Sequence, residues 1–476
     1  MITYKFKTSG KTRSEHDLIG DKDVPMEALF GVQTLRAIEN FNISNNKLGD
    51  YIPFIKAFGI TKKGAALANY QLGLLTKEIT DAIIEACDEL IEGKHADHFP
   101  IDMIQGGAGT SANMNANEVI ANRGLELMGK NHGDYKFLHP NDHVNMAQST
   151  NDAYPTAMHL GLFMYHQDLM KALNLLIASF EQKSKEFAKV IKMGRTQLQD
   201  AVPMTLGQSF GAFASALKNE AKKVDNASKA FLTINMGATA IGTGITAEPG
   251  YAESCTRYIK EITKWDIKLA KDLIEATHDT SSMVDYSSAL KGLAIRVSKI
   301  CNDLRLLSSG PRTGIEEINL PPKQPGSSIM PGKVNPVIPE VVNQICFKVF
   351  GNDTTIAFAS EAAQLELNVM EPVLVESLVE STKWLTAGFD TLRIECVDGI
   401  TANKEHCKHL VEHSIGIVTA LKPYIGYANC TEVAKEALAT GGSVYQLVLD
   451  KNLLSKKDLD TILDPKNMTK PTKVEL

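Results

Sequence analysis

The sequence predicts a mainly α-helical protein whose centre is a bundle of five long helices. Long stretches show the spacing of apolar residues by three and four that is typical of helices, with few glycines or prolines. Aromatic residues make up only 7% of the 476 residues, and segments with alternating β-branched residues are sparse. Alanine and leucine, which favour helices, are abundant instead. These observations together favour helix over strand along most of the chain.

Five helical stretches follow one another in the middle of the chain. The first carries an apolar stripe that includes Leu169, Leu173 and Leu176, and at about 1.5 Å per residue it could exceed about 40 Å. The third spaces its apolar residues alternately by three and four, which is typical of helices that pack alongside one another. The predicted ranges are 162–193, 212–236, 281–309, about 339–367 across Gly351, and 373 to about 396.

The two ends of the chain differ from this centre. The region before Pro155 is polar and rich in loops, and the region after Thr401 contains only short amphipathic pieces. We therefore predict three domains, comprising residues 1–150, 151–405 and 406–476. Helices this long, with apolar residues on more than one stripe, indicate a homo-oligomer, although a long monomeric bundle is the alternative.

Composition excludes several classes of partner. Fifty basic and fifty-six acidic residues leave a formal charge of -6, so the chain lacks the basic excess of a nucleic-acid-binding protein. No stretch reaches the roughly 20 apolar residues of a membrane span, and the N-terminal segment lacks the apolar run of a signal peptide. The seven scattered cysteines lack metal-type spacing and are typical of reduced core thiols. We expect a cytoplasmic protein with a small-molecule partner.

Three segments are rich in small hydroxyl and amide residues. They are GGAGTSANMNANEV at 106–119, NDHVNMAQSTNDAYPT at 141–156 and GRTQLQDAVPMTLGQ at 194–208, and each is expected to open or interrupt a helix. Backbone N–H groups at helix starts, together with hydroxyl and amide side chains, are good receptors for carboxylates. For any single residue, helix capping or a turn is the commoner role.

A fourth segment, GSSIMPGKVNP at 326–336, changes that balance. Glycines and prolines bracket two serines, a lysine and an asparagine, which is the pattern of a mobile loop that ends at a helix start. This segment resembles the signature of the aspartase/fumarase superfamily. The other three segments resemble the remaining conserved regions of that superfamily in the same order, and HDLIGDKDVPMEALFGVQTLRA near the start resembles its opening strand and turn.

Within the superfamily the sequence is most similar to aspartases. The similarity is carried by RAIENFNISNNK, by the segment at 106–119, by VNPVIPEVVNQICFKVFGNDTT and by NVMEPV. Gln197 follows GRT, where fumarases and some aspartases have a histidine and other aspartases have glutamine. Ser209 departs from the aspartase pattern, which has glutamate there. Glu340 resembles a carboxylate that pairs with the histidine in fumarases, and with Gln197 that charged pairing is lost.

The resemblance implies an ammonia-lyase that splits L-aspartate into fumarate and ammonia. A base must remove a weakly acidic β-hydrogen while hydrogen-bond donors stabilise the resulting aci-carboxylate dianion. By resemblance, Ser327 is the base, activated by Lys333 and by backbone N–H groups of the closed loop. The resemblance places Thr110, Ser149, Thr150 and Ser328 at the β-carboxylate, Lys333, Asn335 and Thr196 at the α-carboxylate, and Asn151 and Gln197 near the amino group.

The resemblance also implies a three-domain fold whose bundle forms the core of a tetramer, with sites shared between three subunits. No cofactor is required, no metal is expected in the site, and a divalent cation such as Mg²⁺ is expected only as an activator. His132, His139 and His143 lack metal-type spacing and are expected to be solvated or to cap helices. His278 precedes a bundle helix and could lie near a shared site.

Three alternative functions stay open at this point. A fumarate hydratase shares the loop, as do lyases of larger succinyl adducts, although the flanking segments of those larger-substrate lyases are absent. A catalytically silent structural relative would need damaged motifs. In this chain Thr110, Thr150, Asn151, Ser327, Lys333 and Asn335 all match the superfamily pattern.

Overall fold

The computed structural model describes residues 4–472 and is mainly helical, as predicted. The chain forms two compact units. The first comprises Met1–Met170, Lys222–Gly292 and Phe347–Leu385, and the second comprises Lys171–Ala221, Leu293–Cys346 and Thr386–Leu476. The proposed division into residues 1–150, 151–405 and 406–476 stays a prediction.

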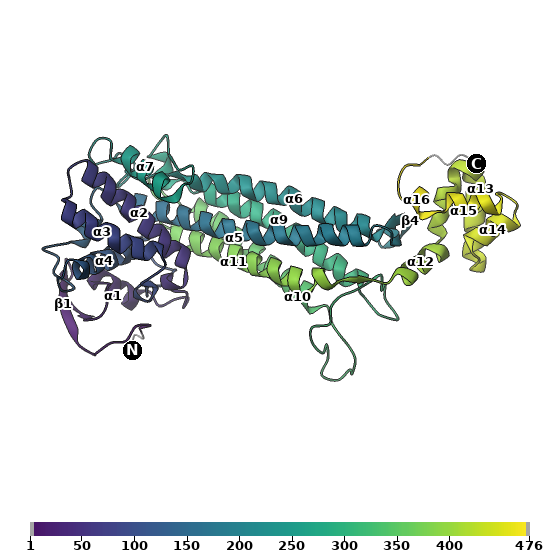
Figure 1. The fold of residues 1–476 in the computed structure, drawn as a ribbon, viewed down its shortest axis with the longest axis horizontal. Coiled ribbons are helices and arrows are strands. Elements are labelled where there is room, and N and C mark those ends of the chain that lie inside the picture. The colour runs from purple at the N-terminus through teal and green to yellow at the C-terminus, as the bar shows by residue number, and fades with distance from the viewer. Residues whose placement is uncertain (1–3, 473–476) are drawn as a thin grey trace. The chain divides into compact units, whose positions relative to one another are not determined.

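Five long helices contribute residues to both units. Within each unit their segments pack side by side (Figure 1). The apolar stripe predicted for the first of them is buried, since Leu169, Leu173 and Leu176 are each 0% exposed. These helices are α5 (Thr150–Glu186), α6 (Leu206–Ser228), α9 (Ser281–Leu307), α10 (Val337–Glu361) and α11 (Glu371–Glu395). The predicted set of five is therefore confirmed, with changes at the ends.

The largest change lies between the first two long helices. Helix α5 begins at Thr150 rather than 162 and ends at Glu186, and the chain then forms a hairpin of β3 (Ile191–Thr196) and β4 (Gln199–Thr205). Ile191 and Met193 belong to an apolar core with residues of the C-terminal helices. Because that packing partner is remote in sequence, the local pattern of residues 162–193 gave helix where the structure has strand.

The rest of the first unit surrounds the starts of α4 and α5. Helix α2 packs against both α3 and α7, and α4 packs against α1 and α3. The elements are β1 (Thr12–Asp17), β2 (Gly20–Pro25), α1 (Val32–Asn40), α2 (Ile52–Gln71), α3 (Lys77–Ile91), α4 (Thr110–Leu127), β5 (Thr233–Ile234), α7 (Tyr251–Thr263), β6 (Lys268–Leu269) and α8 (Glu275–His278).

The remaining elements of the second unit are short, apart from α13, whose 23 residues include a kink at Gly426. Its apolar core joins the β3–β4 hairpin to the C-terminal helices. Beyond the hairpin, the elements are β7 (Ile318–Asn319), β8 (Thr401–Ala402), α12 (Lys404–His413), α13 (Val418–Thr440), α14 (Val444–Asp450), α15 (Lys456–Ile462) and α16 (Pro465–Met468). All seven cysteines of the chain are buried and free, as predicted. None of the helices within residues 4–472 combines the length and apolar character needed to cross a bilayer.

A buried carboxyl group fixes the start of α1. The helix has Gly31 at its N-cap, which offers no side chain for capping. Glu118 of α4 takes that role, since its oxygens accept from the N–H groups of Gly31, Gln33 and Thr34 and from the Thr34 hydroxyl. Burial raises the pKa of Glu118 to about 7, against the opposing effect of these hydrogen bonds. The contact joins the opening segment to α4.

We predict that Glu118→Ala destabilises the protein by about 2–4 kcal/mol, because three backbone donors lose a buried acceptor and a cavity is left. Thermal unfolding followed by circular dichroism measures the effect. The matched control is Glu85→Ala, a change at an exposed glutamate of α3. Equal unfolding midpoints for the two variants would contradict the capping role.

Candidate active site

The start of α4 carries Thr110 on a strained turn. Gly107, Ala108 and Gly109 have φ values of 88°, 53° and 86°, which places three successive residues in the left-handed region. A Cβ at Gly109 would lie 2.4 Å from the Tyr154 ring, so only glycine fits there. The Thr110 hydroxyl is exposed and donates to the Gly107 carbonyl at 2.7 Å. The turn therefore presents Thr110 at the N-terminus of an 18-residue helix.

The start of α5 carries Ser149, Thr150 and Asn151. The Ser149 hydroxyl accepts from the Asn151 N–H at 3.2 Å, and Asp152 accepts from the Ser149 N–H at 3.0 Å. Ser149 is thus a reciprocal cap of the kind expected for this segment. Asp152 also accepts from the N–H groups of Gly237 and Thr239. Burial raises the pKa of Asp152 to about 6, although these backbone hydrogen bonds oppose the shift.

An amide network joins the two helix starts. The Asn113 side chain of α4 donates to the Thr150 hydroxyl at 3.3 Å and to Asn145 Oδ1 at 3.1 Å. Asn151 Nδ2 donates to the Ala240 carbonyl at 2.7 Å, and Asn235 Nδ2 donates to the Asn151 carbonyl at 3.0 Å. The first unit therefore brings Ser149, Thr150 and Asn151 together with the helix that Thr110 opens. Both helix N-termini favour an anionic group there.

Lys62 of α2 lies at the centre of this network and was missed by the sequence analysis. Its side chain is fully buried, and its ammonium group donates to Asn113 Oδ1 at 2.7 Å, Gln148 Oε1 at 2.8 Å and Asn145 Oδ1 at 3.1 Å. Burial lowers the pKa of Lys62 to about 7, while the charge of Asp152 acts in the opposite direction. The available signal was a lysine within the apolar stretch ITKKGAALAN, a pattern that equally suits an exposed helix face.

Thr196 and Gln197 lie at the tip of the β3–β4 hairpin in the second unit. Thr196 pairs with Gln199, so Gln197 and Leu198 form a two-residue turn with φ values of 54° and 61°. Both site residues are exposed. Just before the turn, Arg195 forms an ion pair with the buried Glu317 at 2.6 Å, which anchors the hairpin. The segment at 194–208, which was expected to open or interrupt a helix, presents Gln197 on a strand turn and then opens α6 at Leu206.

The signature segment forms a loop before α10, and hydrogen bonds join the two ends of this loop. The Gly326 N–H donates to the Lys333 carbonyl at 2.6 Å, and Asn335 Nδ2 donates to the Gly326 carbonyl at 2.8 Å. A Cβ at Gly326 would lie 2.8 Å from both the Asn335 nitrogen and the Lys333 oxygen, so the closure requires glycine. Asn335 therefore has a structural role in addition to the one expected at the α-carboxylate.

Ser327 occupies a distinctive position in this loop. Its hydroxyl oxygen accepts from the N–H groups of Met330 at 3.0 Å and Ile329 at 3.2 Å. Two backbone donors aimed at one oxygen would stabilise negative charge on it. Ser328 and Lys333 are exposed, and so is the Ile329 side chain, at 84%. The loop therefore exposes both polar and apolar side chains on its surface.

Two parts of the predicted site within the second unit, the turn at Gln197 and the loop at 326–336, are not joined by hydrogen bonds among the described residues. Nor do those residues include a group of three or more histidine, cysteine, aspartate or glutamate side chains able to hold a metal ion. The roles assigned to the site residues, including Ser327 and Gln197, stay predictions.

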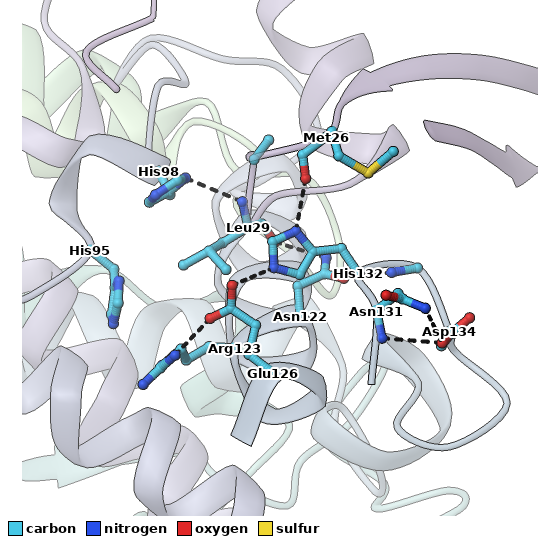
Figure 2. A network of polar contacts seen from close by, with 12 residues as sticks. Met26, Leu29, His95, His98, Asn122, Arg123, Glu126, Asn131, His132 and Asp134 are labelled. Carbon is cyan, nitrogen blue, oxygen red and sulfur yellow. Dashed lines mark hydrogen bonds and ion pairs between the residues drawn. The ribbon is translucent and has the colours of Figure 1, made fainter. Parts of the chain in front are cut away.

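The histidines outside these segments have structural partners. His139 accepts from the N–H groups of Asn141 and Asp142, so it is a capping residue as expected. His132 contacts Glu126 at 2.6 Å and the Met26 carbonyl at 3.0 Å, as Figure 2 shows. His98 accepts from the Leu29 N–H, and burial lowers its pKa to about 4. The His132 contacts tie the opening segment to Glu126 of α4.

His278 is half-buried in the single turn of α8, and its ring contacts the Ile274 carbonyl at 3.0 Å. Among the residues that the structure describes, its side chain makes no hydrogen bond to the starts of α4 and α5. Its place near a shared site stays a prediction.

Comparisons with known proteins cover almost the whole chain. Residues 20–351 match the family described as lyase, and residues 417–470 match the family described as fumarase C C-terminus. The aspartate ammonia-lyase of Pseudomonas aeruginosa is 55% identical over 466 residues, which cover 98% of this chain and 98% of that protein. The match to the lyase family, over residues 20–351, includes all four segments described above.

Two solved structures share the fold. The fumarate lyase:delta crystallin of Brucella melitensis, bound to cobalt, is 50% identical with a TM-score of 0.94, and the match covers 97% of this chain and 100% of that one. The class II fumarase of Schistosoma mansoni is 33% identical with a TM-score of 0.90, over 96% and 99% of the two chains. The chain therefore belongs to the lyase family, within the aspartase/fumarase superfamily.

Proposed function

We propose that the protein is an aspartate ammonia-lyase that converts L-aspartate reversibly to fumarate and ammonia. The observation that carries this proposal is the 55% identity, over nearly the full length, to a protein of that activity. Identity to the class II fumarase is 33% over a similar length. The geometry of the loop and of the helix starts fits the same chemistry.

The reaction starts at Ser327. As an alkoxide, Ser327 removes the β-proton of aspartate, and the negative charge spreads into the β-carboxylate as an aci-carboxylate dianion. The two backbone N–H groups at its oxygen favour the alkoxide. Loop closure would exclude water and strengthen every hydrogen bond to the dianion.

The β-carboxylate is assigned to Thr110, Ser149, Thr150 and Ser328. The Thr150 oxygen accepts from Asn113, which leaves its proton available for a substrate oxygen. The Thr110 proton is engaged by the Gly107 carbonyl, so this hydroxyl must rotate when substrate binds. The partial positive charge at the starts of α4 and α5 adds to these donors, and such preorganised donors contribute several kcal/mol to a barrier.

The α-carboxylate is assigned to Lys333, Asn335 and Thr196, and the amino group to Asn151 and Gln197. Lys333 supplies a formal positive charge to the carboxylate. The amide oxygen of Gln197 can accept a hydrogen bond from the departing amine, but it cannot exchange a proton at neutral pH. Ammonia must therefore leave without acid assistance from this residue.

We further propose a cytoplasmic homotetramer in which three subunits contribute to each site. Large apolar side chains on the long helices support association, since Phe347 and Phe358 of α10 are 59% and 71% exposed and Trp384 of α11 is 43% exposed. The reaction as proposed requires no cofactor, and Mg²⁺ or a similar cation would act only as an activator.

Two alternative functions are weaker. A fumarate hydratase would have to add water without the histidine that fumarases carry at the position of Gln197. A catalytically silent relative would have no need for a loop in which Ser327 receives two backbone donors while Ser328 and Lys333 stay exposed. The relative from Brucella melitensis is named after both an enzyme and a crystallin, so the activity of this chain must be assayed directly.

We predict that Ser327→Ala lowers kcat for fumarate formation from aspartate at least about 100-fold, because the reaction loses its base. The appearance of fumarate is followed by its ultraviolet absorbance. The matched control is Ser455→Ala, which removes a serine that accepts a backbone N–H at the start of α15. Near-normal turnover by the folded Ser327 variant would rule out the base assignment.

We predict that the protein forms little or no malate from fumarate, because Gln197 cannot replace a titratable histidine. Parallel ultraviolet assays with aspartate, malate, argininosuccinate and adenylosuccinate measure the preference. A hydratase rate comparable to the ammonia-lyase rate would contradict the prediction, and turnover of a larger substrate instead of aspartate would overturn the proposed function.

We predict that Lys62→Met lowers kcat/KM for aspartate by about 10–100-fold, mainly through kcat, because the amides that hold Thr150 lose their shared donor. Lys62 is a positioning residue in this role. Lys63→Met is the matched control, since the neighbouring Lys63 instead pairs with Asp88. Steady-state kinetics of both variants, with helicity checked by circular dichroism, test the assignment. Equal activities would show that the network has no catalytic effect.

A further inference from the structure

A cavity of about 380 Å³ lies within the first unit, next to the start of α5. The residues that line it come from α5, the segment around β5, the segment between β6 and α8, α8 itself, α9 and the start of α11. Asn235 belongs to its wall, and the same side chain donates to the Asn151 carbonyl at 3.0 Å. The cavity therefore adjoins the first turn of α5, where Asn151 is assigned to the amino group of aspartate.

Glu371 is one of the residues that line this cavity. It is 4% exposed, and its Oε2 makes no hydrogen bond within the described residues. Burial raises its pKa to about 8, and burial is the sole cause of that shift. A buried carboxyl group that lacks a donor is costly, and native proteins usually supply one from the chain, a water molecule or a ligand. Glu371 also belongs to the NVMEPV segment, to which no function has been assigned so far.

The other charged groups of the wall make the cavity acidic. Asp272, Glu275 and Asp279 outnumber Lys271, and Asp272 and Asp279 are already engaged by backbone N–H groups at the starts of α8 and α9. His159 adds no positive charge near neutral pH, because burial lowers its pKa. An acidic cavity with one unpartnered carboxyl group favours a small cation that can donate hydrogen bonds.

The arrangement favours a monovalent cation over a metal ion. No group of three or more histidine, cysteine, aspartate or glutamate side chains in residues 4–472 is placed to ligate a divalent ion. An ammonium ion needs one carboxylate and a few oxygen acceptors, and Thr280 and Ser282, which both carry hydroxyl groups, also line the cavity. We infer that this cavity binds ammonium, with Glu371 as its carboxylate partner.

This inference rests on the proposed ammonia-lyase function. It gives the ammonia that leaves aspartate a binding site next to Asn151. Ammonia released beside Asn151 would take the proton of the neutral Glu371 carboxyl group, and the products are ammonium and a carboxylate held as an ion pair. No further reactant is needed. In the reverse direction the same pair returns the proton to Glu371 and delivers ammonia to fumarate.

The first test measures binding without turnover. The thermal unfolding midpoint of the whole protein is recorded against ammonium chloride, with tetramethylammonium chloride added to hold the ionic strength constant, and with potassium chloride in a parallel series. We expect ammonium to raise the midpoint of the native protein and to have no such effect on Glu371→Gln. Glu366→Gln, at an exposed residue of the preceding segment, is the matched control and should respond like the native protein.

Three results would overturn the inference: no ammonium-dependent stabilisation of the native protein, equal stabilisation of Glu371→Gln, or equal stabilisation by potassium. The glutamine variant keeps the shape of the side chain, and its own unfolding transition reports whether it is folded.

The second test measures the reverse reaction. We expect Glu371→Gln to raise the KM for ammonium at least about 10-fold, which is about 1.4 kcal/mol of lost binding, with an unchanged KM for fumarate. An unchanged KM for ammonium in an active enzyme would disprove the ammonium site and leave the proposed function standing. Ammonium-specific stabilisation of a protein that does not deaminate aspartate would support the ammonium site and disprove the proposed function.

Discussion

The buried ammonium group of Lys62 is the interaction on which the first part of the site depends. Its three protons meet three amide oxygens, from Asn113, Asn145 and Gln148, and the first of these amides holds the Thr150 hydroxyl. A lone buried charge would be expensive, but a full set of acceptors offsets much of the desolvation cost. The network therefore fixes the starts of α4 and α5 relative to one another.

A second feature recurs in both units. Backbone N–H groups point to places where negative charge would develop in the proposed reaction. At the starts of α4 and α5 they add to the helix dipole, and in the loop two of them converge on the Ser327 oxygen. Fixed dipoles of this kind need little reorganisation during a reaction, so in the proposed mechanism they would help to stabilise a dianion with few cations.

Much of the fold could be predicted because its signals are local. The period of apolar residues along 281–309 indicated α9, and the polar segments at 106–119 and 141–156 indicated the helix starts that the structure has. The hairpin at 191–205 could not be predicted in this way. Ile191 and Met193 have the apolar character of a continuing helix, and only their packing against C-terminal helices selects a strand.

The sequence by itself determined the superfamily, through the loop at 326–336, and the set of long helices, because both depend on residues close together in the chain. Tertiary structure alone decided which polar groups are buried and which partners they meet. The sequence does not mark Lys62 or Glu371 as buried, and their burial follows from elements far apart in the chain. Desolvation in that folded environment shifts the pKa of both groups towards neutrality, because burial disfavours their charged forms.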